Sequence, residues 1–192
     1  MAQVVTTGKI GNSLTKDASM TWPTTGLDLT AYQGSWTLDP AATSVAFATK
    51  AIWILPTKGT FKARSGTATV AADGSVQGTL VLDAASIDTH MKKRDEHLRA
   101  ADFLDVKKYP TITFSVVAAK RLAADRLDIV GSLTVRGQTR PLTVTATVSI
   151  AGNSATLVIE TDIDRRDWDV PLVKLGSGVL NHVVASARFT RD

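Results

Sequence analysis

The chain has 192 residues, of which 44% are hydrophobic, and its 22 basic and 18 acidic residues give a formal charge of +4. This length and composition predict one globular domain with a sizeable core rather than a disordered chain. The basic residues are interspersed with acidic ones, so no nucleic-acid partner is predicted, and the absence of cysteine excludes disulfides, thiolate metal sites and cysteine nucleophiles.

Residues 1–34 are rich in Gly, Thr and Ser and show no sustained hydrophobic periodicity. We interpret them as an N-terminal extension of a domain at 35–192. The extension is either a partly ordered tail or an arm that packs on the domain or a partner through Trp22, Leu27 and Leu29. It lacks a basic start followed by an apolar stretch, and no run in the chain is long enough to cross a bilayer. A cytoplasmic location is therefore expected, or a periplasmic or secreted one if the true N-terminus is missing.

From Trp36 onward, short runs rich in Val, Thr and Ile are separated by Gly, Asp-Gly or Asp-Pro, which is typical of β-structure. Residues 75–83 and 141–150 alternate most clearly between apolar and polar side chains, and tight turns are expected at 72–74 and 151–153. The other strand-like runs are 44–52, 59–70, 111–119, 127–134, 155–162 and 179–189. Roughly eight or more strands at hairpin spacing favour an antiparallel barrel or sandwich.

A dense polar segment follows the run at 75–83. It predicts one short helix at about 91–101, capped by Asp88 or Thr89. Arg94, Asp95 and His97 could form a general acid–base group. Their spacing is equally that of a surface helix with local ion pairs, in which Arg94 pairs with an acid. We favour this anchoring role.

Acidic residues next to the helix have a structural role in the same interpretation. Asp88, Asp102 and Asp105 are expected to cap backbone N–H groups at turns. No catalytic residue is therefore predicted, and the chain lacks phosphate-loop, dinucleotide and nucleophile-elbow motifs.

The three histidines do not favour a metal site. His90 and His97 would share a helix face but lie about two turns apart, too far to bind one ion, and His182 is in a strand-like run. The Asp162-x-Asp164 pattern could supply oxygen ligands for calcium, but two arginines follow it directly. No metal and no cofactor are predicted.

Three blocks of sequence occur in a specific order and together resemble the YceI-like family of polyisoprenoid-binding, lipocalin-like bacterial proteins. The blocks are Trp36–Pro40 with Ser44–Phe47; Ser86–Thr89 with Arg94-Asp95, His97-Leu98, Asp102-Phe103, Tyr109-Pro110 and Phe114; and Gly131–Gly137. Any one block alone is a weak signal, but a chance match of all three is not expected.

The resemblance implies an all-β fold, a lipocalin-like antiparallel β-barrel with one short helix between strands, around an elongated apolar cavity. It also implies a mobile loop near 170–178 at the barrel mouth. The modest size of the strand residues is compatible with an open lumen. A dry lumen would bind an isoprenoid tail through buried area alone.

The implied function is binding, storage or transport of a polyisoprenoid, an isoprenoid quinone-like lipid or a similar long-chain amphiphile. The candidate ligand-binding residues are Phe47, Phe61, Leu80, Leu82, Ile112, Phe114, Leu133, Val144 and Ile159. Two alternatives stay open: an enzyme that acts on a lipid-like substrate through Arg94, Asp95 and His97, and a stress-related interaction module with a filled barrel. A homodimer and a transient contact with a membrane surface are further expectations.

Overall fold

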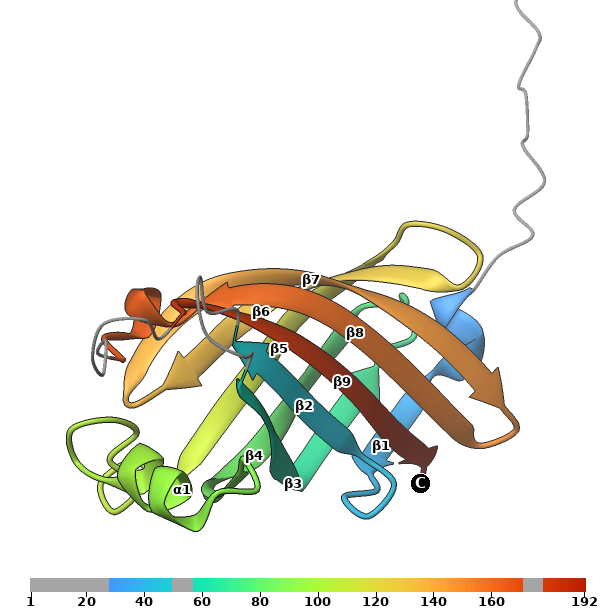
Figure 1. The fold of residues 1–192 in the computed structure, drawn as a ribbon. Coiled ribbons are helices and arrows are strands. Elements are labelled where there is room, and N and C mark those ends of the chain that lie inside the picture. The colour runs from blue at the N-terminus through green and yellow to red at the C-terminus, as the bar shows by residue number, and fades with distance from the viewer. Residues whose placement is uncertain (1–27, 50–56, 171–177) are drawn as a thin grey trace, which may run out of the picture.

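The computed structural model describes residues 28–49, 57–170 and 178–192. Within them the chain forms one antiparallel sheet and three short helices (Figure 1). The strands are β1 (Gly34–Leu38), β2 (Ser44–Thr49), β3 (Thr57–Val70), β4 (Val76–Asp88), β5 (Thr111–Arg121), β6 (Arg126–Val135), β7 (Gln138–Ala151), β8 (Ser154–Asp164) and β9 (Leu180–Arg191). The helices are η1 (Leu29–Tyr32), α1 (Lys92–Arg99) and η2 (Arg165–Trp168).

The sheet closes on itself, which confirms the predicted lipocalin-like barrel. Each strand from β3 to β9 pairs with the next along the chain, and β1 and β2 both pair with β3 on one side and β9 on the other. The two short strands thus lie end to end in one barrel position, separated by a turn in which Asp39 accepts hydrogen bonds from the N–H groups of Ala41 and Ala42. Closure therefore leaves none of the nine described strands at an open edge of the sheet.

Alternation of side chains sets which face of each strand turns inward. In β7, Val144, Ala146 and Val148 are buried while the residues between them are exposed, as the sequence pattern predicts. The predicted turn at 72–74 joins β3 to β4, and the turn at 151–153 joins β7 to β8. Between β6 and β7, Arg136 and Gly137 both have positive φ, of 50° and 75°, which matches the twist of a two-residue hairpin.

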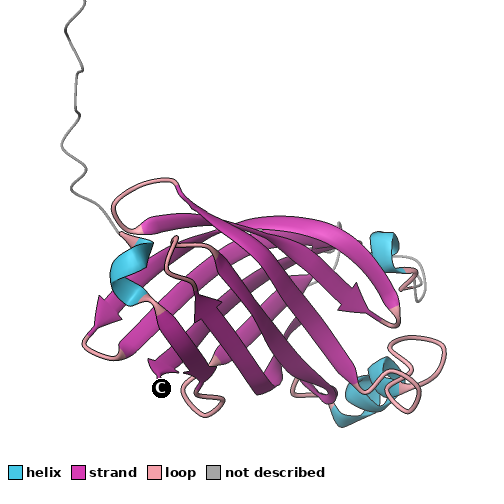
Figure 2. Cartoon of the chain, turned by 180° about the vertical axis from the view of Figure 1, so that it is seen from behind, coloured by secondary structure: helices cyan, strands magenta, loops and turns pink. Residues whose placement is uncertain are grey.

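The helices lie at the two ends of the barrel (Figures 1 and 2). α1 and η2 are at one end, and η1 is at the other. Leu29 of η1 packs against the buried residues of that second end, which include Trp36 and Leu127. The predicted contact of Leu29 is therefore present, while Trp22 and Leu27 lie outside the described residues.

Helix α1 differs from its prediction in its ends and its cap. It spans Lys92–Arg99, its N-cap residue is Met91, and no side chain caps it there, so the predicted caps Asp88 and Thr89 are wrong. The reason is that His90 adopts a positive φ of 61° and turns the chain before the helix begins. Among the described residues, no helix is long and apolar enough to span a membrane.

Candidate functional site: an apolar cavity at one end of the barrel

A cavity of about 490 Å³ opens inside the barrel toward the end that carries α1 and η2. This volume is within the range of pockets that enclose small-molecule ligands. All nine residues predicted to bind the ligand line this cavity: Phe47, Phe61, Leu80, Leu82, Ile112, Phe114, Leu133, Val144 and Ile159. Their contact with a ligand stays a prediction, but the barrel is not filled, contrary to one of the alternatives.

The strands supply the apolar wall of the cavity. Phe47 on β2 and Phe61 on β3 come from adjacent strands, with their ring centroids 5.5 Å apart. Gly59 makes this possible, because a Cβ at that position would lie 2.6 Å from the ring of Phe47. A hydrocarbon chain against such a wall would make dispersion contacts and would remove apolar surface from water.

The polar side chains of the wall gather toward the α1 and η2 end. They are Thr49, Thr57, Arg94, His97, Thr161, Arg165 and Asn181. Among the described lining residues none carries a carboxylate, whereas Arg94 and Arg165 carry positive charge. The cavity therefore has an apolar interior and an electropositive, hydrogen-bonding mouth.

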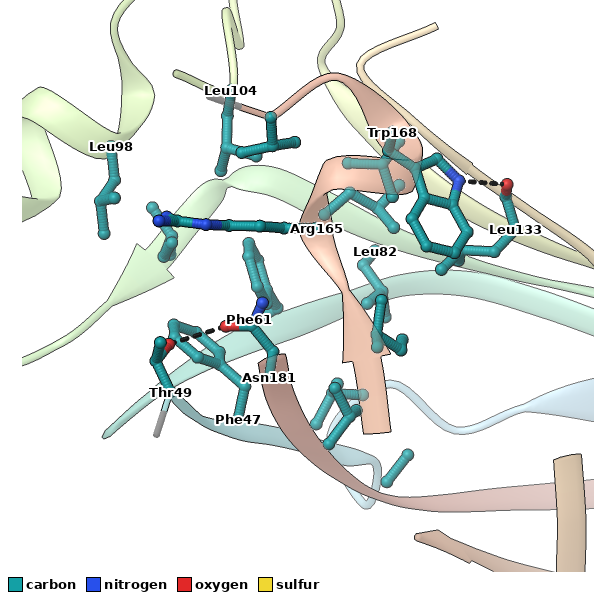
Figure 3. Close-up of a pocket in the computed structure, with 18 of the residues that line it drawn as sticks. Phe47, Thr49, Phe61, Leu82, Leu98, Leu104, Leu133, Arg165, Trp168 and Asn181 are labelled. Atoms are coloured by element: carbon teal, nitrogen blue, oxygen red, sulfur yellow. Dashed lines mark hydrogen bonds between the residues drawn. The ribbon is translucent and has the colours of Figure 1, made fainter. Parts of the chain in front are cut away.

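Arg165 is a charged side chain of the cavity wall, contributed by η2. Figure 3 shows it extending into the pocket, with Asn181 turned toward Thr49 below it. Burial lowers the pKa of Arg165, and the nearby charge of Asp164 only partly opposes this effect. The guanidinium lies 5.6 Å from the centre of the Phe103 ring, and Thr49 donates a 2.7 Å hydrogen bond to Asn181.

Helix η2 is held so that it closes one side of the mouth. The Asp164 carboxylate caps it by accepting from the N–H of Arg166. Trp168 is buried against the cavity, and its indole Nε1 donates a 2.8 Å hydrogen bond to the carbonyl of Leu133. The indole ring of Trp168 is therefore packed in an apolar environment, and its N–H has a hydrogen-bond acceptor.

Arg136, in the turn between β6 and β7, joins three segments at this end. Its two terminal nitrogens donate to the carbonyls of Asp169, just after η2, and of Ala101, just after α1. Two helices that are far apart in the sequence are thereby tied to one hairpin.

Helix α1 is anchored through Thr89 and Asp95. The buried carboxylate of Asp95 accepts hydrogen bonds from both the N–H and the hydroxyl of Thr89. Arg94 donates to the hydroxyl and the carbonyl of the same Thr89, and at 3.4 Å to Thr57. The anchoring role is thus present, but Arg94 binds a threonine where the sequence analysis expected an acid.

A further anchor comes from Arg99, which the sequence analysis did not single out. Its guanidinium donates to the carbonyls of Ala85 and Ile87, where β4 approaches the helix. Asp88 accepts a 2.7 Å hydrogen bond from the N–H of His90, so its predicted turn-capping role is confirmed. Asp102 lies 3.7 Å from Nδ1 of His97, an ion pair whenever that imidazole is protonated.

The residues of the enzyme alternative do not converge on one point. Arg94 and His97 line the cavity, but Asp95 is absent from its wall and is occupied by Thr89. His97 Nε2 is buried and has no hydrogen-bond partner in the described part of the chain.

The residues considered for metal binding are also separated. His90 precedes the helix and is exposed, so the expected shared helix face with His97 is wrong. His182 lies between Asp162 and Glu160, one at each ring nitrogen, at 2.8 and 3.0 Å. Asp164 pairs with Arg166. The described residues contain no group of three or more His, Asp or Glu side chains placed to hold one metal ion.

Several residues of the cavity wall are not predictable from strand alternation. Leu98, Phe103 and Leu104 come from α1 and the segment after it, and Trp168 and Val170 come from η2 and its end. Strand alternation could not identify them, because they lie outside the strands. The proposed mouth loop 170–178 falls almost wholly outside the described residues.

Comparison with known proteins identifies the relatives of this chain. The family model of the YceI-like domain matches residues 36–188. Protein YceI of Escherichia coli O157:H7 is 43% identical over 93 residues, covering 46% of this chain and 47% of that protein. A UPF0312 protein of Vibrio parahaemolyticus is 34% identical over 114 residues, covering 56% and 59% respectively. The chain thus spans about half the length of the curated relatives it matches.

Two solved structures have the same fold. BcnA of Burkholderia cenocepacia has a TM-score of 0.69 and 22% identity, covering 79% of this chain and 98% of that one. A polyisoprenoid binding domain of Saccharophagus degradans has a TM-score of 0.67 and 13% identity, covering 82% and 98%. At these identities the likeness shows the architecture of the barrel.

Proposed function

The chain belongs to the family of YceI-like domains, and from this premise we propose that it binds a polyisoprenoid or a similar long-chain amphiphilic lipid inside its barrel. The observation that carries the proposal is the cavity of about 490 Å³, which has an apolar wall and a polar mouth. A similarly folded protein is described as a polyisoprenoid binding domain.

The apolar interior supports a hydrocarbon tail as the buried part of the ligand. A tail makes no hydrogen bonds, so its affinity comes from the apolar area it removes from water, less the cost of ordering the chain. Such apolar area is supplied by Leu82, Ile112, Leu133 and Val144. Their side chains have no polar group that would lose its hydrogen bonds to water when a tail binds.

The charge at the mouth supports a head group that accepts hydrogen bonds. Arg165 is partly desolvated, which strengthens its interaction with an acceptor. Arg94 and His97 line the same side, and a phosphate or carboxylate would meet no like charge among the described lining residues. We therefore place the head group beside Arg165 and the tail along the strands. Storage or transport of the lipid, a homodimer and contact with a membrane surface stay predictions.

Extraction of the purified protein with organic solvent, followed by mass spectrometry, tests the proposal. We expect a long-chain amphiphile in near-stoichiometric amount, and uptake of an added prenyl alcohol by protein stripped of lipid. Protein that yields no lipid and takes up no prenyl alcohol would refute lipid binding.

A further inference from the structure

A second cavity, of about 130 Å³, lies inside the barrel toward the η1 end. Its described lining is uncharged and includes Leu29 and Tyr32 of η1 and Trp36 of β1. Joining it to the large cavity would enlarge the lumen by about a quarter. The added space would receive only the distal end of a tail, because the polar mouth is at the opposite end.

Three residues line both cavities and form the partition between them: Leu80 on β4, Phe114 on β5 and Ile159 on β8. Leu80 and Phe114 are directly opposite each other on neighbouring strands. Phe114 is the only aromatic residue of the three, and it packs against the buried clusters on both sides. Its ring is therefore the largest group at the partition.

The position of the Phe114 ring depends on Gly131 of β6. A Cβ at Gly131 would clash with the Ser115 carbonyl oxygen and would lie 3.0 and 3.1 Å from two ring carbons of Phe114, so the absence of a side chain lets the strand and the ring approach closely there. The ring is only partly buried, and a phenylalanine has no hydrogen bond to hold it. Rotation about χ1 between staggered wells would move it away from the partition.

We propose that Phe114 determines how long a tail the barrel accepts. This inference rests on the proposed lipid-binding function and adds to it a residue that selects ligand length. A tail that fills the large cavity ends at the ring of Phe114, and a longer tail enters the small cavity only when the ring swings aside.

Binding of all-trans prenyl alcohols that lengthen by one isoprene unit at a time tests the proposal on lipid-free full-length protein. Affinity in the parent should rise with each unit and then level off at a limiting length. Each buried methylene strengthens binding roughly fourfold, so a newly admitted five-carbon isoprene unit should strengthen binding by up to about a thousandfold before the cost of ordering the tail is subtracted. Phe114→Ala should weaken the alcohols that end at the ring, because it removes part of the wall of the large cavity, and it should shift the limiting length to alcohols at least one isoprene unit longer.

Phe47→Ala is the matched control, because Phe47 lines only the large cavity and loses the same atoms. It should change affinity without admitting longer alcohols. Phe114→Leu is a milder variant should Phe114→Ala fail to fold, and Phe114→Trp should shorten the limit. An unchanged limit in folded Phe114 variants would overturn the proposal while leaving lipid binding intact. A parent that binds no prenyl alcohol would instead overturn the proposed function together with this inference.

Discussion

At the scale of single residues, Asp95 is the buried charge that holds α1 to the barrel. Burial raises the pKa of its carboxyl, but the hydrogen bonds from Thr89 and the positive charges of Arg99 and Arg94 outweigh this, so the pKa lies below its ordinary value of 3.8. A carboxyl with a lowered folded-state pKa adds stability above its unfolded pKa, and this stability is lost as the pH falls through the folded pKa.

Asp95→Asn should therefore destabilise the protein most at neutral pH. Loss of the charged acceptor should lower the free energy of unfolding by about 1–3 kcal/mol. The gap between parent and variant should shrink as the pH falls below 3.8. Urea unfolding at pH 7 and at acidic pH measures this gap, and Glu96→Gln, an exposed neighbour on the same helix, is the control with little expected effect. A gap that is constant with pH would contradict the charged role of Asp95.

Arg165 offers a second test at this scale. Arg165→Met should weaken binding of a prenyl phosphate by about tenfold or more, since a charged hydrogen bond contributes about 1.5–3 kcal/mol. Binding of the alcohol with the same tail should change far less. Arg166→Met is the control, because Arg166 is exposed, pairs with Asp164 and is not in the described lining. Equal losses for phosphate and alcohol would place the head group elsewhere.

At the scale of elements, the barrel closes with different devices at its two ends. At the mouth, Arg136 donates to the carbonyls that follow η2 and α1, and Arg99 of α1 donates to a carbonyl of β4. These hydrogen bonds place polar groups near the cavity. At the other end, η1 inserts Leu29, and the carbonyl of Tyr32 accepts a hydrogen bond from the indole of Trp36. Arginine hydrogen bonds thus hold α1 and η2 at the mouth, whereas apolar packing of Leu29 and one indole hydrogen bond hold η1 at the opposite end.

Removal of the η1 contact gives a prediction at this scale. Leu29→Ala should lower the free energy of unfolding by about 1–2 kcal/mol, because the side chain is only partly buried. Thermal or urea unfolding measures the change, and Gln33→Ala, an exposed position after η1, serves as the control. Equal stability of the Leu29 variant and the parent would mean that η1 rests on the barrel without holding it.

At the scale of the whole molecule, the lumen contains an unfilled volume that a larger side chain can occupy. Leu82 is buried and lines the large cavity, so Leu82→Trp should fill part of it and reduce the lipid recovered after extraction. Overpacking should cost about 1–3 kcal/mol without unfolding the barrel. Leu122→Trp makes the same substitution at an exposed residue and should retain lipid. Equal lipid recovery from both variants would count against the cavity as the binding site.

The sequence by itself determined eight of the nine described strands, all but β1, and indicated the buried face where the alternation is clearest, at 75–83 and 141–150. The period of two in residues such as Val144, Ala146 and Val148 requires one buried face, because a slip of one residue would expose every apolar side chain of the strand. The nine predicted residues consequently line one cavity. Short-range turn chemistry likewise placed the turns at 72–74 and 151–153.

Only the tertiary structure decided how the ends of the barrel are built. The contacts of Arg136 with Asp169 and Ala101, and of Trp168 with Leu133, join residues more than thirty positions apart, and no local periodicity encodes such pairs. The cap of α1 was mispredicted because the positive φ of His90 turns the chain before the helix, and Thr89 donates to Asp95 in the first turn instead of accepting from a backbone N–H. Barrel closure brings these distant groups together, and the polar mouth and the Phe114 partition exist only in the closed barrel.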